Sequence, residues 1–307
     1  MSTLPIDNAK KFTDFDAIAQ LEDSTIILAH TGDGIRKITY GELKTGMKDL
    51  FTEEFAGFEQ NVTDINAVLA KINATGAGAH NAIYRGKDLG NAVTAAQYAA
   101  IAAGTFDDLY IGDYWTIGGI VYRIAAFDYY YRAGDTDCTT HHVTLVPDAN
   151  MYTHCMNDTN DTTGAYVSSK MYTEGLEQAK TTINSAFGSA HILNHRQYLK
   201  NAVTNGYESG GSWYDSTVEL MTEQNVYGGV IFAHTSSGAA LPAAYTVDKS
   251  QFPLFTFRPD MISNRQWYWL RDVVSAATFA DVGTDGHATY IGASLATGVR
   301  PAFSIKS

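Results

Sequence analysis

Residues 278–305, at the end of the larger part of the chain, read TFADVGTDGHATYIGASLATGVRPAFSI. Short runs of aromatic and β-branched residues are separated here by glycine-rich breaks, which predicts short β-strands. Asp285 and Gly286 predict the turn of a hairpin. The final run, ending at Ile305, predicts a last strand that returns the chain to the sheet.

The same mixture of aromatic and β-branched runs with glycine-rich breaks extends over residues 107–307. Residues 110–131, YIGDYWTIGGIVYRIAAFDYYY, predict a β-hairpin with a glycine turn. Residues 171–188 predict a helix that ends at Gly188, and residues 195–203 predict the start of another. The loops between them are rich in Gly, Ser and Thr. The sequence therefore predicts the α+β class for this domain.

Two smaller regions precede this domain. Residues 23–44 read as strand, turn and strand, so residues 1–46 are expected to form a small β unit. Such a hairpin needs neighbours, because an isolated one is at best marginally stable. Residues 94–104, TAAQYAAIAAG, predict a helix capped by Thr94 and stopped by glycine. We assign residues 74–106 to a connector.

Residues 51–72, FTEEFAGFEQNVTDINAVLAKI, predict a heptad helix. Its apolar residues follow one another at alternating steps of four and three: Phe51, Phe55, Phe58, Val62, Ile65, Leu69 and Ile72. This seam is narrower than the stripe of an ordinary globular helix, and Leu at position a with Ile at d disfavours a parallel dimer. We predict a coiled-coil oligomerisation helix over residues 47–73, with a trimer as first choice. The alternative is an amphipathic helix packed on its own domain.

Composition and charge exclude several classes of protein. Of the 307 residues, 45% are hydrophobic and 18% are charged, so a core is expected and wholesale disorder is not. The net charge of −12 argues against nucleic-acid binding, because that binding depends on Lys and Arg neutralising phosphates. The first residues lack the apolar region of a signal peptide, and no run approaches the ~18 apolar residues of a membrane span. We expect a soluble product of the cytoplasm without membrane insertion.

A cysteine–histidine cluster is the strongest candidate for a metal site. Residues 137–155, DCTTHHVTLVPDANMYTHC, contain five cysteine and histidine residues, which are types that bind zinc. These are Cys138, His141, His142, His154 and Cys155. Their spacing matches no standard zinc finger, so a disulfide or buried thiols beside hydrogen-bonded histidines are alternatives, and the thiols are preferred. Residues 135–137 and 157–161 are rich in oxygen ligands, which leaves calcium open as well.

Three segments near the end of the chain carry a family resemblance. WYWLRD at 267–272, FADVGTDGHATYIGAS at 279–294 and GVRPAFSI at 298–305 resemble the terminal block of C-type-lectin-like domains. Such domains occur in bacterial and phage surface proteins and share their fold with sulfatase-modifying enzymes. Residues 80–307 resemble modules found in phages of Firmicutes. The resemblance implies a C-type-lectin-like fold over residues 107–307, with Arg300 in a polar network that pins the last strand.

The front of the chain fits the plan of a phage fibre-type virion protein. Residues 1–46 would dock on other virion proteins, and the coiled coil would make the chain a homotrimer. The distal domain would then bind a host cell-surface glycan or receptor from the virion surface, after synthesis in the cytoplasm of the bacterial host. A head fibre or capsid decoration protein with a structural role is one alternative. An enzyme on the lectin-like scaffold is another.

The residues argue against an enzyme. The sulfatase-modifying relatives need cysteines late in the domain, whereas Cys155 is the last one here. A G-x-S-x-G nucleophile motif does not occur. Asp215, Glu219 and Glu223 are spaced by four, which predicts one acidic helix face exposed to solvent rather than a pair of opposed carboxylates.

Two polar segments with aromatic residues are candidates for a glycan site. The first, GYESGGSWYDS, is interpreted as a glycine-rich loop, and loops often carry binding residues. The second, SNRQ, directly precedes WYW, whose tryptophans we interpret as core residues. The candidate ligand-binding residues are Tyr207, Glu208, Trp213, Tyr214, Asp215, Asn264 and Arg265.

Overall fold

The computed structural model describes residues 24, 26–31, 34–72, 76–233 and 250–307. The chain divides into two compact units, residues 1–73 and residues 74–307, and each is described by itself. The boundary between the two units therefore falls at the end of the heptad helix. Residues 74–106, assigned above to a connector, belong to the second unit.

The first unit contains a hairpin followed directly by a helix. Strands β1 (Ile26–Thr31) and β2 (Gly34–Thr39) are antiparallel, as the strand–turn–strand pattern predicted. The helix α1 (Tyr40–Ile72) begins at the next residue, seven positions before the predicted start. Thr39 and Glu42 form a capping box: the backbone N–H of Glu42 donates to Thr39 Oγ1 (3.1 Å), and that of Thr39 donates to Glu42 Oε2 (2.7 Å). The rest of residues 1–46, namely 1–23, 25 and 32–33, lies outside the described residues.

The helix α1 presents its described seam residues to solvent. Phe51, Val62 and Ile65 are 51%, 40% and 58% exposed. Leu43 and Met47 are exposed too, and they continue the seam towards the start of the helix in steps of four. The remaining seam side chains lie outside the described part of the structure: Phe55, Phe58, Leu69 and Ile72.

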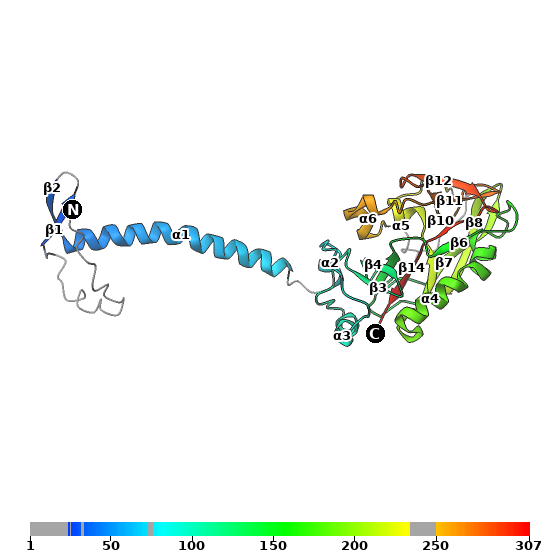
Figure 1. The fold of residues 1–307 in the computed structure, drawn as a ribbon, viewed down its shortest axis with the longest axis horizontal. Helices are drawn as coiled ribbons and strands as arrows, with labels where there is room; N and C mark the ends of the chain where they lie inside the picture. The colour runs from blue at the N-terminus through cyan, green and yellow to red at the C-terminus, as the bar shows by residue number, and fades with distance from the viewer. Residues whose placement is uncertain (1–23, 25, 32–33, 73–75, 234–249) are drawn as a thin grey trace. The chain divides into compact units, whose positions relative to one another are not determined.

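The second unit is built on two five-stranded sheets and a separate hairpin (Figure 1). The first sheet has the order β3-β4-β5-β14-β9, the second has the order β12-β11-β10-β13-β6, and β7 pairs with β8. The strands are β3 Tyr114–Ile117, β4 Ile120–Phe127, β5 Val143–Pro147, β6 Tyr152–His154, β7 His195–Thr204, β8 Tyr207–Ser216, β9 Val218–Leu220, β10 Tyr268–Val273, β11 Thr278–Val282, β12 Ala288–Gly292, β13 Thr297–Val299 and β14 Pro301–Ile305. The helices are α2 Ala77–His80, α3 Ala95–Ala103, α4 Glu177–Phe187, α5 Glu223–Tyr227 and α6 Pro253–Phe257, with a π-helical turn at Met171–Gly175 and short 3₁₀ turns. The predicted α+β class is confirmed.

The two sheets share a core because their strands alternate. Tyr268 and Leu270 of β10 pack with residues of the first sheet such as Leu145 and Phe303. Trp269, between them, points to the opposite face and packs in a second apolar cluster with Phe279. This period of two is the signature of a strand covered on both faces.

The last strand closes the first sheet, as residues 298–305 predicted. β14 pairs with β5 on one side and β9 on the other, and all five of its residues are buried. Arg300, which directly precedes it, is 1% exposed and donates hydrogen bonds to the carbonyl oxygens of Pro147 (2.8 Å) and Ile262 (3.0 Å). Its guanidinium lies 5.0 Å from the ring centroid of Tyr268. These contacts tie the last strand to two distant segments.

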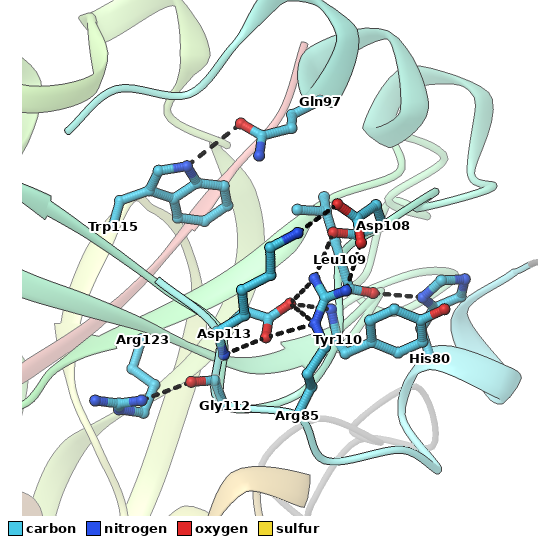
Figure 2. Close-up of polar contacts among 11 residues, drawn as sticks. His80, Arg85, Gln97, Asp108, Leu109, Tyr110, Gly112, Asp113, Trp115 and Arg123 are labelled. Atoms are coloured by element: carbon cyan, nitrogen blue, oxygen red, sulfur yellow. Dashed lines mark hydrogen bonds and ion pairs between the residues drawn. The ribbon is translucent and has the colours of Figure 1, made fainter. Parts of the chain in front are cut away.

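A buried carboxylate joins residues 85–87 to residues 108–113. Asp113 is fully buried and accepts hydrogen bonds from Arg85 Nη2 (2.7 Å) and from the backbone N–H groups of Lys87 (2.8 Å) and Tyr110 (2.9 Å), as Figure 2 shows. Arg85 also pairs with Asp108. Ion pairs of this kind hold a segment in register because a buried carboxylate is costly without its partners.

The predicted helix in this region is confirmed. In α3, the Thr94 side chain accepts from the backbone N–H of Gln97, and Gly104 ends the helix in the left-handed conformation. Ile101 and Phe106 are fully buried in the main core. The region is therefore part of the domain's packing.

Three sequence interpretations on the β7–α5 region were wrong. Residues 195–203 form the strand β7 rather than a helix; its buried positions include the polar His195 and Gln197, which hid the alternation. The glycine-rich segment 207–216 is the paired strand β8 rather than a loop. The three acidic residues spaced by four fall on β8, β9 and α5, so they share no helix face. Glu219 and Glu223 are buried, and Glu219 accepts a hydrogen bond from Tyr166 Oη (2.8 Å).

Candidate functional site

A groove at one end of the second sheet is a candidate site, because an exposed aromatic ring and a charged side chain both line it. It encloses about 550 Å³ between the segment that leads into β10, the hairpin before β12, and the approach to β13. We call it the Trp267 groove. Its lining residues are Asn150, Thr153, Arg265, Gln266, Trp267, Thr284, Ile291, Leu295, Ala296, Thr297 and Gly298.

Trp267 gives the groove an exposed aromatic surface. We interpreted both Trp267 and Trp269 as core residues from the sequence, and this is correct only for Trp269, which is fully buried. Trp267 is 40% exposed because it stands one residue before β10 begins, at the end of the sheet. The His287 ring meets its edge at a centroid distance of 6.3 Å. The polar run SNRQ before WYW was the signal that the first tryptophan belongs to a loop.

The Asn150 side chain joins three neighbouring residues of the groove region by hydrogen bonds. Its Nδ2 donates to Gln266 Oε1 (3.1 Å) and to the Trp267 carbonyl oxygen (2.9 Å), while its Oδ1 accepts from Asn264 Nδ2 (2.6 Å). A side chain at Gly298 would place its Cβ 1.9 Å from Asn150 Nδ2, so only glycine fits there. The groove's shape is thus fixed by side-chain bonds within the free chain.

A tight turn presents Arg265 and its neighbours. The Arg265 backbone is left-handed (φ +64°), a conformation that non-glycine residues rarely adopt. The turn is held by Ser263 Oγ, which accepts from the Arg265 N–H (3.2 Å) and donates to the Thr284 carbonyl oxygen (2.7 Å). Asn264 Oδ1 accepts from the Gln266 N–H (3.0 Å). As a result, three consecutive side chains, 265–267, are exposed together.

Asp281 is a buried acid on the same face of the sheet. It stands opposite Trp269 and Thr289 in the strand register, and Ile291, two residues beyond Thr289, lines the groove. Side chains two apart in a strand share a face. Neither carboxylate oxygen of Asp281 has a hydrogen-bond partner among the described residues. Burial raises the pKa of Asp281 from 3.8 to about 7, against the opposing effect of His287.

Most of the predicted ligand-binding residues do not meet at one site. They are spread along β8: Tyr207 is exposed at its start, and Trp213 packs edge-on against Tyr198. Glu208 is buried and accepts from the Val273 N–H (3.0 Å). Tyr214 packs against Tyr172, and Asp215 pairs with Arg196. Of the predicted residues, only Arg265 lines the Trp267 groove, and Asn264 donates a hydrogen bond to the lining residue Asn150.

The predicted metal ligands fall in two separate strand regions. His141 Nδ1 bonds Asp128 Oδ2 (2.7 Å), and His142 is fully buried with its Nδ1 on the Thr140 carbonyl oxygen (2.9 Å). Burial lowers the pKa of His142 and raises that of Cys138. His154 and Cys155 lie at β6, with His154 Nδ1 on the Cys155 carbonyl oxygen (2.6 Å).

Both cysteines, Cys138 and Cys155, are free thiols. No set of three or more metal-ligating side chains comes together within the described residues. In the two segments considered for calcium, Asp135 pairs with Arg196 and Asp158 with Lys170. Asp161 accepts from the Thr163 hydroxyl at 2.8 Å.

Comparisons with known proteins add no identification. The chain matches no protein family, no curated protein and no solved structure. Among the described helices, none has the length and apolar character needed to cross a membrane.

Proposed function

We propose that this chain is a phage virion protein of the fibre type: a homotrimer that displays a lectin-like domain, residues 107–307, for adhesion to a host receptor or glycan. In this proposal the chain is not an enzyme. It sits on the virion surface, and residues 1–46 attach it to other virion proteins. The proposal rests on the terminal segments that resemble C-type-lectin-like domains and on the exposed seam of α1.

The observation that carries the proposal is the apolar seam of α1. A single helix of 33 residues that exposes Phe51, Val62 and Ile65 loses the hydrophobic stabilisation that normally holds a helix in place. Packing these side chains into the seam of two further copies would bury them, at roughly 25 cal/mol for each Å² of apolar surface removed from water. Leu at a and Ile at d favour more than two strands.

Trimerisation would also suit a weak distal site. A shallow groove on one domain binds a ligand weakly, because it buries only part of that ligand. Three grooves on one assembly convert the second and third contacts into intramolecular events, which gains factors of roughly 10² or more in avidity. The coiled coil and the Trp267 groove therefore serve one function in this proposal.

The test measures mass and adhesion on the same preparations. Light scattering of the full chain is expected to give three times the 33.4 kDa of one chain, while residues 74–307 give one. Labelled full-length protein is expected to bind host bacterial cells at least tenfold more tightly than residues 74–307. A trimer that binds no cells from a broad panel of Firmicutes would favour a head fibre or capsid decoration role instead. A full-length monomer would remove the fibre plan.

A further inference from the structure

The Trp267 groove combines an aromatic surface with one charged group. Trp267 supplies an exposed ring, against which the apolar face of a sugar ring can stack. Ile291 and Leu295 extend this apolar surface, while Thr153, Thr284 and Gln266 offer hydrogen-bonding groups around it. Flat aromatic surface edged by hydroxyl and amide groups is the chemistry that suits a pyranose.

Among the residues that the structure describes, Arg265 is the only charged one that lines the groove. Its side chain is exposed, and its guanidinium makes no hydrogen bond or ion pair with any residue in the described ranges. The nearby acid Asp285 is already bonded to His287, which holds the pKa of Asp285 below its usual value. The Arg265 guanidinium is therefore available to an anionic group of a ligand at the same groove that Trp267 lines.

The backbone turn at Arg265 places this side chain and that of Trp267 in the lining of the groove. The left-handed conformation at Arg265 is one that residues with a side chain adopt rarely. Three side-chain bonds from Ser263 and Asn264 fix the turn. The Arg265 and Trp267 side chains are therefore offered together from a fixed backbone, which lowers the entropy lost on binding.

We propose that the Trp267 groove binds an anionic saccharide. A pyranose ring stacks on Trp267, and a carboxylate or phosphate on the same sugar pairs with the Arg265 guanidinium, whose planar fork matches both anions. Gln266 and the threonines bond the sugar hydroxyls. This inference deepens the proposed adhesion function by naming the ligand class.

The experiment compares matched acidic and neutral saccharides on the full chain. Saturation-transfer NMR and fluorescence titration use galacturonate and galactose 6-phosphate as acidic probes, with galactose as their shared neutral counterpart. The acidic probes are expected to bind at least fivefold more tightly than galactose, and to lose that advantage between 50 and 500 mM salt (~tenfold change in ionic strength). The relative strength of the two acidic probes separates a carboxylate ligand from a phosphate ligand.

Two variants assign the contacts, and one controls for them. Arg265→Gln is expected to abolish the preference for acidic probes while leaving neutral binding unchanged. Trp267→Ala is expected to abolish binding of both. Arg196→Gln, on β7 and away from the groove lining, is the control and is expected to bind as the unmodified protein does.

Outcomes that overturn this inference differ from those that overturn the proposed function. Equal binding of acidic and neutral probes, an unaffected Arg265→Gln variant, or no binding of any probe at millimolar concentration would each overturn the ligand class. A trimer that still adheres to cells would then leave the fibre proposal standing. A monomer that binds acidic probes through Arg265 would support the site and remove the fibre.

Discussion

Asp281 is a buried acid whose ionisation is expected to change the stability of the fold. Its carboxyl is buried without a hydrogen-bond partner among the described residues, and its pKa rises from 3.8 to about 7. An acid whose pKa is higher in the folded state binds its proton more tightly there than in the unfolded chain. Its contribution to stability is therefore fully present below pH ~4 and is lost as the pH rises through about 7.

We accordingly predict that Asp281→Asn raises the melting temperature more at pH 8 than at pH 5. The amide cannot ionise, so the variant lacks the destabilisation that the buried charge brings at high pH. Calorimetry of residues 74–307 at several pH values measures the difference between the variant and the unmodified chain. A difference that is constant from pH 5 to pH 8 would contradict the prediction.

Arg300 is the residue on which the closure of the first sheet depends. We predict that Arg300→Met destabilises residues 74–307 by about 3 kcal/mol or more, because it removes the hydrogen bonds that the buried guanidinium donates to the carbonyl oxygens of Pro147, Met261 and Ile262. Urea unfolding followed by circular dichroism measures the change. Lys180→Met, which removes an exposed pair with Glu177, is the control and is expected to cost about 0–1 kcal/mol. Equal effects of the two substitutions would show that Arg300 is not structural.

At the scale of elements, α1 carries a seam longer than its heptads. From Leu43 to Phe55 the apolar residues are spaced four apart, and from Phe55 to Ile72 the steps alternate between three and four. Successive steps of four are a stutter, which locally unwinds a left-handed supercoil. In the proposed trimer the contact would therefore begin near the hairpin, with nearly straight helices, and continue as an ordinary coiled coil.

Two substitutions test this seam. Ile65→Asp is expected to reduce the trimer to monomers, because it buries three charges without partners. Met47→Asp is expected to weaken the trimer, with at least a tenfold rise in the dissociation constant, if the stutter region is also in contact. Light scattering over a dilution series measures both, and Ala56→Asp, on an exposed position outside the seam, is the control. If Met47→Asp behaves as the control does, the contact starts at Phe51.

For the molecule as a whole, the larger compact unit is residues 74–307. We predict that this fragment is a folded monomer, whereas residues 107–307 are not stably folded, because they lack Ile101, Arg85 and the rest of the segment that packs on Asp113. Circular dichroism melting of the two fragments, with light scattering, measures this. A cooperative transition at the same temperature in both would show that residues 74–106 are dispensable.

The helices and strands that could be predicted from the sequence are those whose sequence signals lie within a short window. The hairpin in residues 26–39, the capped helix α3 and the final strands follow from turn glycines, a threonine cap and alternating apolar residues within short windows. The heptad pattern likewise predicted the helix, since periodicity of this kind needs no information from distant residues.

Which faces of the strands are buried follows from tertiary contacts and not from the local sequence. His195 and Gln197 are polar yet point inward, so β7 was misread as helix, and the sharing of one core by residues 74–106 depends on partners far along the chain. Trp267 and Trp269 differ by two positions and look equivalent in sequence. One is buried and the other exposed because the sheet ends between them and its covering layer ends with it. Burial is set by contacts between segments that are distant in sequence, which no local pattern records.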